Sequence, residues 1–321
     1  MRIGVVGAGA IGGLYGGVLA RAGHQVSFLA RGEQLGAIQS RGLKIESPTF
    51  GSFVVQAPAT DSPAEMGEAD LVLFAVKTYD LDQAVLAARQ MLAAEGKLIT
   101  FQNGLEAPDL VAAALGEERV LIGTTGLEVT IIEPGVVGHL ADWHYVTVST
   151  LNGPPTPGVE QTVETLHAAG INASVAPDGH RALWEKALIL VPMATVTSVC
   201  RAPIGPIRDL PATRQLAFTL LDDVTRVARA CGYDLPEAHE RARGTIENAP
   251  PSMKASMARD FERGKRTELE ALTGAVVRLA EARGLDVPTT RAAYAILKLR
   301  ERLETDPTGA KKPVGIGAAG R

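Results

Sequence analysis

The chain has 321 residues, about twice the usual length of one domain, so two domains are expected. Apolar types make up 46% of the residues and charged types 21%, which excludes disorder for most of the chain. The formal net charge of -4 provides no basic field for a polyphosphate chain, which argues against nucleic acid as the main partner. Cys200 and Cys231 fit neither a disulfide framework nor a metal site, which favours a reducing, cytoplasmic setting.

The first half of the chain alternates short apolar runs with helical patterns, which is typical of a parallel sheet wrapped by helices. Strands are predicted at residues 2–6, 25–29, 71–76, 98–101 and 120–123, and helices at residues 11–22, 80–94 and 107–115. Strand-like segments at residues 42–46, 53–57, 136–139 and 145–149 are expected to extend the sheet or to form its antiparallel edge. The pattern predicts a doubly wound, Rossmann-type α/β domain over residues 1–177.

Long helical patterns replace the strands beyond about residue 175, at residues 181–199, 212–230, 236–247, 256–283 and 289–303. A turn signal, Pro177-Asp178-Gly179, precedes them, so an all-helical domain is predicted over residues 178–305. The apolar run at residues 187–196 is interrupted by Pro192 and is shorter than the roughly 20 residues that cross a membrane, so it is expected to be a core helix. Residues 306–321 lack apolar periodicity and are predicted to be disordered.

A glycine-rich turn follows the first strand and opens the first helix. Its sequence, Gly7-Ala8-Gly9-Ala10-Ile11-Gly12, has the spacing of a dinucleotide-binding loop. In such loops the first glycine permits a tight turn, the second lets the backbone approach a pyrophosphate, and the third allows close helix–strand packing. A plain strand-to-helix turn is the alternative interpretation, and the position in a βαβ unit favours dinucleotide binding.

The end of the second predicted strand favours NADP(H) over NAD(H). An acidic residue there would bind the ribose hydroxyls of NAD, but this position holds Ala30, and Arg31 follows with a guanidinium suited to a phosphate. Lys77, after the strand at residues 71–76, is expected at the same edge of the sheet and would add a second positive charge. The alternative for Arg31 is a solvated surface arginine.

Taken together, several motifs give the chain a specific family resemblance over about residues 1–305. Besides the glycine-rich loop, the motifs are Leu29-Ala30-Arg31-Gly32, Ala75-Val76-Lys77-Thr78, Gln102-Asn103-Gly104, Trp184-Glu185-Lys186, Ser256-Met257-Ala258-Arg259-Asp260, Thr267-Glu268-Leu269-Glu270 and Thr273-Gly274-Ala275-Val276. With these, the chain resembles the ketopantoate reductases (2-dehydropantoate 2-reductases). The resemblance implies NADPH-dependent reduction of a 2-keto acid in a cleft between a Rossmann-type domain and a helical domain.

The resemblance also implies two catalytic residues. Lys186 matches the lysine that hydrogen-bonds the keto oxygen and donates a proton, and its place beside an apolar run would lower its pKa; a lysine that extends to the surface is the alternative. Glu268 matches the glutamate that contacts the substrate hydroxyl and helps to hold the lysine. On the predicted helix 256–283 it would point inward, with a surface ion pair as the alternative.

Two further residues match family positions that also have local explanations. Asn103 matches a residue near the nicotinamide and the substrate, but Asn103-Gly104 is also a strong turn dipeptide. Ser256 matches a serine that binds the substrate carboxylate, but a serine at a helix start is equally explained as an N-cap.

The chain departs from the family pattern at two expected substrate-binding positions. Where family members carry asparagines four and eight residues after the lysine, this chain has Leu190 and Ala194, which are expected to line the cleft without hydrogen-bonding capacity. Three functions therefore compete: ketopantoate reduction in pantothenate synthesis, reduction of a more apolar 2-keto acid, and a nucleotide-binding sensor without turnover. Retention of Lys186 and Glu268 argues against the sensor. No membrane partner is expected, and a homodimer is an open possibility.

Overall fold

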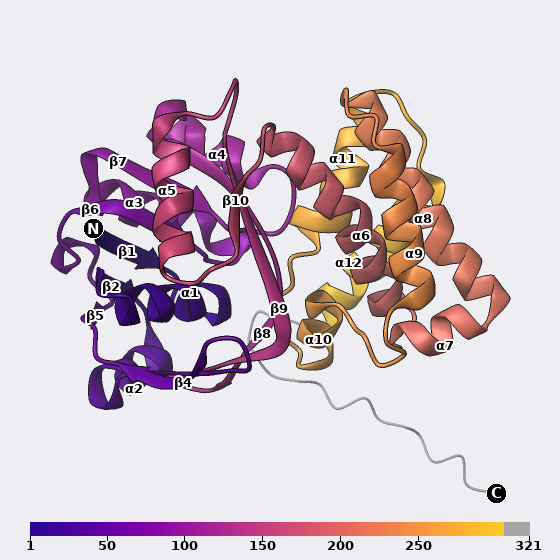
Figure 1. Cartoon of the computed structure of the whole chain (residues 1–321). Helices are drawn as coiled ribbons and strands as arrows, with labels where there is room; N and C mark the ends of the chain where they lie inside the picture. The colour runs from indigo at the N-terminus through magenta and orange to yellow at the C-terminus, as the bar shows by residue number, and fades with distance from the viewer. Residues whose placement is uncertain (305–321) are drawn as a thin grey trace, which may run out of the picture. The chain divides into compact units, whose positions relative to one another are not determined.

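The computed structural model describes residues 1–304 and divides the chain into two compact units (Figure 1). The first unit is Met1–Leu183 and the second begins at Trp184, so the division falls inside helix α6 (Gly179–Val199). The sequence placed the domain boundary at residue 177, directly before this helix. The disorder predicted for residues 306–321 concerns a segment outside the described residues.

One sheet forms the centre of the first unit. Its strands are β1 (Arg2–Val6), β2 (Gln25–Leu29), β3 (Leu43–Ser47), β4 (Gly51–Val55), β5 (Ala59–Thr60), β6 (Ala69–Phe74), β7 (Leu92–Thr100), β8 (Val120–Glu133), β9 (Val136–Thr150) and β10 (Ala173–Val175). The order is β4-β3-β9-β8-β7-β6-β1-β2-β5, with β10 beside β9. From β5 to β8 all pairs are parallel, and the chain order reverses beside β1. This is the doubly wound arrangement, and the predicted fold class is confirmed.

The antiparallel edge of the sheet is longer than the sequence pattern indicated. The segments predicted at residues 136–139 and 145–149 belong to one strand, β9, which pairs antiparallel with β8 along most of its length. The prediction ended the preceding strand at Gly123, but β8 continues to Glu133. Two irregularities in the register let the β8–β9 ribbon continue where strict alternation is lost.

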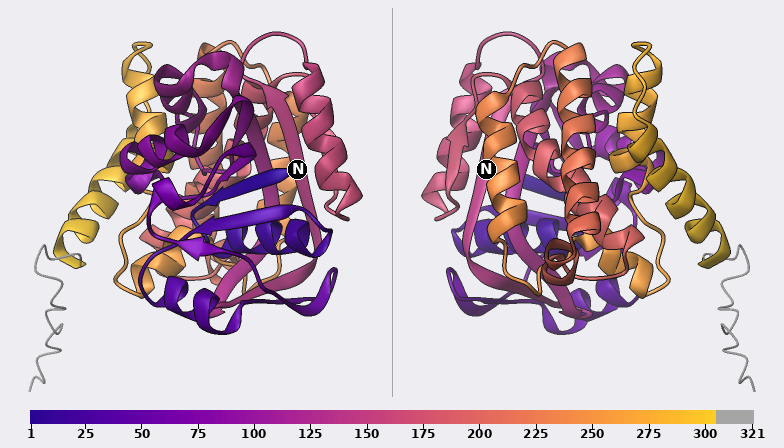
Figure 2. Two further views of the ribbon diagram at one scale, coloured as in Figure 1. Left: turned by 90° about the vertical axis from the view of Figure 1, so that its left-hand side faces the viewer. Right: turned by 90° about the vertical axis from the view of Figure 1, so that its right-hand side faces the viewer.

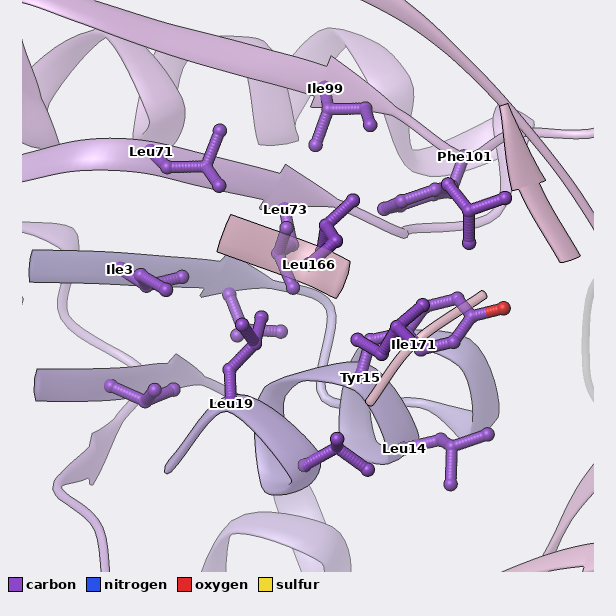
Figure 3. Packing of buried hydrophobic residues seen from close by; sticks show 14 of the residues in the cluster. Ile3, Leu14, Tyr15, Leu19, Leu71, Leu73, Ile99, Phe101, Leu166 and Ile171 are labelled. Carbon is purple, nitrogen blue, oxygen red and sulfur yellow. The ribbon is translucent and has the colours of Figure 1, made fainter. Parts of the chain in front are cut away.

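Helices cover both faces of this sheet: α1 (Ala10–Arg21), α2 (Gly32–Arg41), α3 (Leu81–Met91), α4 (Ala107–Leu115) and α5 (Pro157–Ala168). Successive residues of β1 therefore face different helices. Ile3 lies in a buried cluster with Leu14 and Leu19 of α1 (Figure 3). On the other face, a Cβ at Gly4 would lie 3.0 Å from Met91 Sδ of α3. Burial on both faces explains why β1 is apolar from Ile3 to Val6.

Helix α1 packs closely on the sheet because glycines face the strands. A Cβ at Gly16 would lie 2.6 Å from Phe28 Cε1 of β2 and 2.8 Å from Val5 Cγ2 of β1. A Cβ at Gly13 would lie 2.9 Å from Val137 Cγ2 of β9. Any side chain at these positions would push the helix away from the sheet.

The second unit is helical within the described residues. It contains the greater part of α6 and, after it, α7 (Ile204–Asp209), α8 (Pro211–Ala230), α9 (Pro236–Asn248), α10 (Ser256–Glu262), a π-helix η4 (Glu270–Gly274), α11 (Ala275–Glu281) and α12 (Pro288–Glu304). Helices α8 and α9 run side by side (Figure 1, Figure 2). Helix α6 is long and apolar enough to cross a membrane, but 67% of its apolar window is buried inside the protein, which is typical of a core helix.

The single helix predicted at residues 256–283 is wrong. The structure has α10, then a turn in which Gly264 adopts a φ of 60°, and only then the π-helix and α11. A left-handed residue cannot continue a right-handed helix, so the chain reverses its path here although the apolar periodicity continues. The predicted helix at residues 80–94 also ends early, because β7 begins at Leu92.

Two alanine substitutions test the packing of α1. Gly16→Ala is expected to lower the thermal midpoint, because the added methyl group overlaps with Phe28 and Val5, and overpacking costs typically about 1–3 kcal/mol. Gly36→Ala, the matched control in α2, has nothing within 4 Å of its new Cβ and is expected to raise the midpoint slightly, because alanine favours helix over glycine. Circular dichroism melts measure both, and a Gly16→Ala melt as stable as Gly36→Ala would contradict the packing argument.

Candidate functional site

The carboxyl ends of β2, β1, β6 and β7 lie at one edge of the sheet. The register pairs Val6 with Leu29 on one side and with Phe74 on the other, and it pairs Phe74 with Thr100. The segments that follow these strand ends carry the residues predicted to bind the cofactor: residues 7–12, Arg31, Lys77 and Asn103. Ligands of doubly wound sheets bind at this edge, where the strand order reverses. The first unit thus brings these predicted residues to one edge.

The three glycines of the loop have three different surroundings. Gly7 has a φ of 97°, and a Cβ there would lie 2.9 Å from the backbone nitrogen of Val76. A Cβ at Gly12 would lie 2.2 Å from the carbonyl oxygen of Gly7, so only glycine fits. A Cβ at Gly9 would meet nothing within 4 Å. The loop is therefore packed tightly at its first and third glycines and open at its second, which fits a backbone that must approach a diphosphate.

The residues between these glycines form the start of α1. The backbone nitrogen of Ala8 donates to Leu29 of β2, and its carbonyl oxygen accepts from Gln34 Nε2 at 2.9 Å. Ala10 and Ile11 lie in the first turn of α1, whose N-cap is Gly9, and no side chain caps this end. The amide groups of the first turn of a helix lack intrahelical acceptors and attract anions.

Arg31 follows β2 as the N-cap of α2. Its side chain is 75% exposed, and its Nη2 lies 2.5 Å from Asp80 Oδ2. Ala30, at the position where an acidic residue would favour NAD, is buried. Arg31 is therefore available from solvent, as a phosphate ligand must be, but it has a carboxylate partner that the sequence did not indicate.

Lys77 and Asn103 both have partly buried side chains. Lys77 precedes the 3-10 helix η2 (Thr78–Asp80), after β6. Asn103 follows β7, and Gly104 after it has a φ of 106°. The chain therefore bends at the Asn-Gly dipeptide, where Gly104 adopts the left-handed conformation that glycine favours.

Gln102 links the segment after β6, which carries Lys77, to the segment after β7, which carries Asn103. Its side chain is buried, and its Nε2 donates to the carbonyl oxygens of Phe74 at 2.9 Å and Val76 at 3.2 Å. These carbonyls lie just before Lys77, and Gln102 itself precedes Asn103. One amide group therefore links the backbone of both predicted cofactor residues, a role that no local sequence signal revealed.

In the second unit, Lys186 lies on α6 directly after two residues whose side chains contact other parts of the unit. Trp184 is buried, with its ring centroid 6.4 Å from that of Tyr233. Glu185 forms an ion pair with Arg241 of α9 at 3.5 Å. The residues preceding Lys186 thus attach this turn of α6 to the helices around it.

Lys186 and Glu268 interact within the second unit. Burial lowers the pKa of Lys186 to about 8, and the Glu268 carboxylate acts in the opposite direction and raises this pKa. Glu268 is only 4% exposed, so it is not the surface glutamate that the alternative interpretation allowed. It does not lie on a helix as predicted, but in the turn before the π-helix.

Buried hydrogen bonds hold the turn that carries Glu268. The backbone nitrogen and hydroxyl of Thr267 both donate to Glu301 Oε1 of α12, at 3.2 and 2.6 Å. The hydroxyls of Thr195 on α6 and Thr273 in the π-helix lie 2.8 Å apart, and both side chains are fully buried. The helix that carries Lys186 and the segment that carries Glu268 are therefore joined by a direct hydrogen bond.

The predicted substrate-binding residues differ in accessibility. Leu190 is partly buried and Ala194 is fully buried on α6. Ser256 is exposed at the first residue of α10, where Ala255 is the N-cap and no side chain caps the helix. The alternative interpretation of Ser256 as an N-cap is therefore not supported.

Comparisons with known proteins agree with this architecture. Two family models match the chain: ketopantoate reductase PanE/ApbA over residues 3–153 and ketopantoate reductase PanE/ApbA C terminal over residues 178–301. A 2-dehydropantoate 2-reductase of Halobacterium salinarum is 32% identical over 305 residues, covering 94% of this chain and 99% of that protein. An uncharacterised oxidoreductase of Bacillus subtilis is also 32% identical, over 304 residues, with coverage of 94% and 99%.

Solved structures show the same relationship. A PanE/ApbA family ketopantoate reductase from Ralstonia eutropha has a TM-score of 0.87 at 31% identity, covering 95% of this chain and 99% of its own. D-mandelate dehydrogenase, at 19% identity and a TM-score of 0.86, shares the fold. With both family models matched in order along the chain, the protein belongs to the ketopantoate reductase family of oxidoreductases.

Proposed function

We propose that this chain is an NADPH-dependent reductase that converts a 2-keto acid to a 2-hydroxy acid, with ketopantoate as the first candidate substrate and the cytoplasm as its place of action. The observation that carries the proposal is the interaction of the partly buried Lys186 with the buried Glu268, in which desolvation lowers the lysine pKa to about 8. A lysine of ordinary pKa is a weak acid, whereas a pKa of about 8 brings it into the range of a general acid at neutral pH.

The edge of the sheet in the first unit fits a dinucleotide. The open space above Gly9 and the uncapped start of α1 would receive the diphosphate, and Arg31 with Lys77 would receive a 2′-phosphate. Ala30 provides no carboxylate for the ribose hydroxyls of NAD, which supports NADPH. Members of this family use a nicotinamide cofactor, which when bound supplies the hydride that reduces C2 of the keto acid.

Lys186 would perform the proton transfer. Its protonated ammonium would hydrogen-bond the keto oxygen, polarise the carbonyl and release a proton to that oxygen as the C2 carbon is reduced. Glu268 would keep enough of the lysine protonated at neutral pH, because its carboxylate opposes the effect of burial. An ionised carboxylate only accepts hydrogen bonds, and Glu268 would accept one from a hydroxyl of the substrate.

A single substitution tests this function. Lys186→Ala is expected to lower turnover with ketopantoate and NADPH by at least about 100-fold, the usual contribution of a general acid, and to leave NADPH binding nearly intact. Lys265→Ala, which removes an exposed lysine of the same unit, serves as the control and is expected to leave turnover unchanged. Comparable turnover in Lys186→Ala would remove this residue from the mechanism. A wild-type protein that binds NADPH but reduces no keto acid would be the sensor instead.

The pH dependence of turnover follows from the lowered pKa of Lys186. Because reduction needs the protonated amine, kcat is expected to fall as the pH rises through about 8. Glu268→Gln removes the charge that raises this pKa, so the falling limb should move to lower pH. Measuring kcat from pH 6 to 10 for both proteins checks the sign. A limb that stays in place or moves to higher pH would show that Glu268 does not act on the lysine.

A second candidate substrate class is a more apolar 2-keto acid. Leu190 and Ala194 cannot hydrogen-bond a substrate hydroxyl through their side chains. The nearby hydroxyls are engaged elsewhere: Thr195 pairs with Thr273, and Thr197 donates to the carbonyl of Met193 at 2.6 Å. Both threonine hydroxyls of α6 thus already form hydrogen bonds within the protein.

Competition kinetics can distinguish the two substrate classes. A buried substrate hydroxyl without a partner costs about 1–3 kcal/mol, which lowers kcat/KM for ketopantoate by roughly 5- to 150-fold relative to a site that bonds this hydroxyl. Each CH₂ of an apolar substrate that the site buries contributes about 0.8 kcal/mol to binding. We expect ketoisocaproate or benzoylformate to rival ketopantoate in kcat/KM. A value for ketopantoate far above both would assign the chain to pantothenate synthesis.

A further inference from the structure

Asp80 uses its carboxylate in an unusual way for its position. It is the N-cap residue of α3, a position where aspartate normally accepts a backbone hydrogen bond, yet no side-chain cap is formed. Its Oδ2 instead accepts a hydrogen bond from Arg31 Nη2, from a residue 49 positions earlier in the chain. The carboxylate is thus directed toward the guanidinium expected to hold a 2′-phosphate.

We propose that Asp80 is a specificity-determining residue that competes with the 2′-phosphate of NADPH for Arg31 and so narrows the preference for NADPH over NADH. The inference rests on the proposed role of Arg31 as a phosphate ligand. In this role, the Asp80 carboxylate is the anion that pairs with Arg31 whenever no 2′-phosphate is bound.

The geometry of the pair favours competition. Asp80 contacts one terminal nitrogen of Arg31, and the arginine side chain remains 75% exposed. A phosphate that used the full bidentate fork of the guanidinium would have to share or displace this carboxylate. The two anions would then lie on the same small cation and repel each other, a cost that an NADH ribose with neutral hydroxyls does not meet.

The formal charges of the segments that follow β2 and β6 cancel. Arg31 and Lys77 contribute two positive charges, and Asp80 and Glu33, in the first turn of α2, contribute two negative charges. Removing the Asp80 charge would leave this group net positive. The attraction for a dianionic phosphate should then increase, and the attraction for a neutral ribose should change little.

The opposite role, in which Asp80 orients Arg31 for the phosphate, predicts the opposite sign. An orienting carboxylate would usually hold the fork by two bonds and restrict its motion. Here one bond is formed to a mostly exposed side chain. The two roles are therefore separated by whether loss of the carboxylate tightens or weakens binding of a 2′-phosphate.

Binding of small adenosine phosphates to the full chain tests the proposal. The probes are 2′,5′-ADP, which carries the 2′-phosphate, and 5′-AMP, which lacks it. Asp80→Asn is expected to tighten 2′,5′-ADP by about 2- to 5-fold, the scale of an exposed ion pair, and to leave 5′-AMP unchanged. The gain should shrink in high salt, because exposed charges are screened. Asp82→Asn, which removes an equal charge from the first turn of α3, is the matched control and should change neither affinity.

Arg31→Ala separates failure of this inference from failure of the proposed cofactor choice. If Arg31→Ala leaves 2′,5′-ADP binding unchanged, Arg31 is no phosphate ligand and the NADPH assignment falls with it. If Arg31→Ala weakens 2′,5′-ADP but Asp80→Asn leaves it unchanged or weakens it, the cofactor assignment stands and the competing role of Asp80 is overturned. An equal gain with Asp82→Asn would also overturn it, because the effect would then be one of general charge.

Discussion

The close approach of α1 to the sheet is the constraint on which the cofactor edge depends. A Cβ at Gly12 would collide with the carbonyl oxygen of Gly7, and a Cβ at Gly7 would lie 2.9 Å from the backbone nitrogen of Val76. The helix can therefore begin directly beyond β1 only if both positions lack side chains. That approach brings the helix start beside the end of β2, where the backbone nitrogen of Ala8 bonds to Leu29. The amides at the start of α1 and the segment that carries Arg31 therefore lie at the same edge of the sheet, because glycines let α1 pack directly on the strands.

In the second unit the corresponding constraint is the partly buried positive charge of Lys186. Removing Lys186 from water destabilises its charged form, and a carboxylate in the same protein environment restores part of that stability. The carboxylate must itself be held, and Glu268 lies in a turn with little regular structure. Hydrogen bonds from Thr267 to Glu301 and between Thr195 and Thr273 supply the rigidity that a helix would otherwise give. In both units, hydrogen bonds of the backbone or of threonine hydroxyls hold the segments that carry the predicted site residues.

Sequence was sufficient where the signal is local. The alternation of strand and helix patterns predicted the fold, and the set of motifs along the chain, in their order and spacing, predicted the family. Sequence did not predict the helix end at Gly264. The apolar periodicity continues through this residue, but its φ is positive and ends the helix there. Sequence also missed the contacts that determine how site residues are held, since Asp80 lies 49 positions from Arg31 and pairings at such separation leave no local pattern. The contact of α6 with the π-helix is of the same kind, because Thr195 and Thr273 lie 78 positions apart in the chain.

The π-helix before α11 affects the direction of the chain segment that precedes it. The amide of Gly274 bonds to the carbonyl of Leu269, five residues back, so this turn holds one more residue than an α-helical turn. Deleting one residue there would restore ordinary winding and rotate the preceding chain by about 100° relative to α11. The turn that carries Glu268 would then face another direction relative to α11. The winding of this one turn therefore sets the direction of the Glu268 segment, independently of which side chains the segment carries.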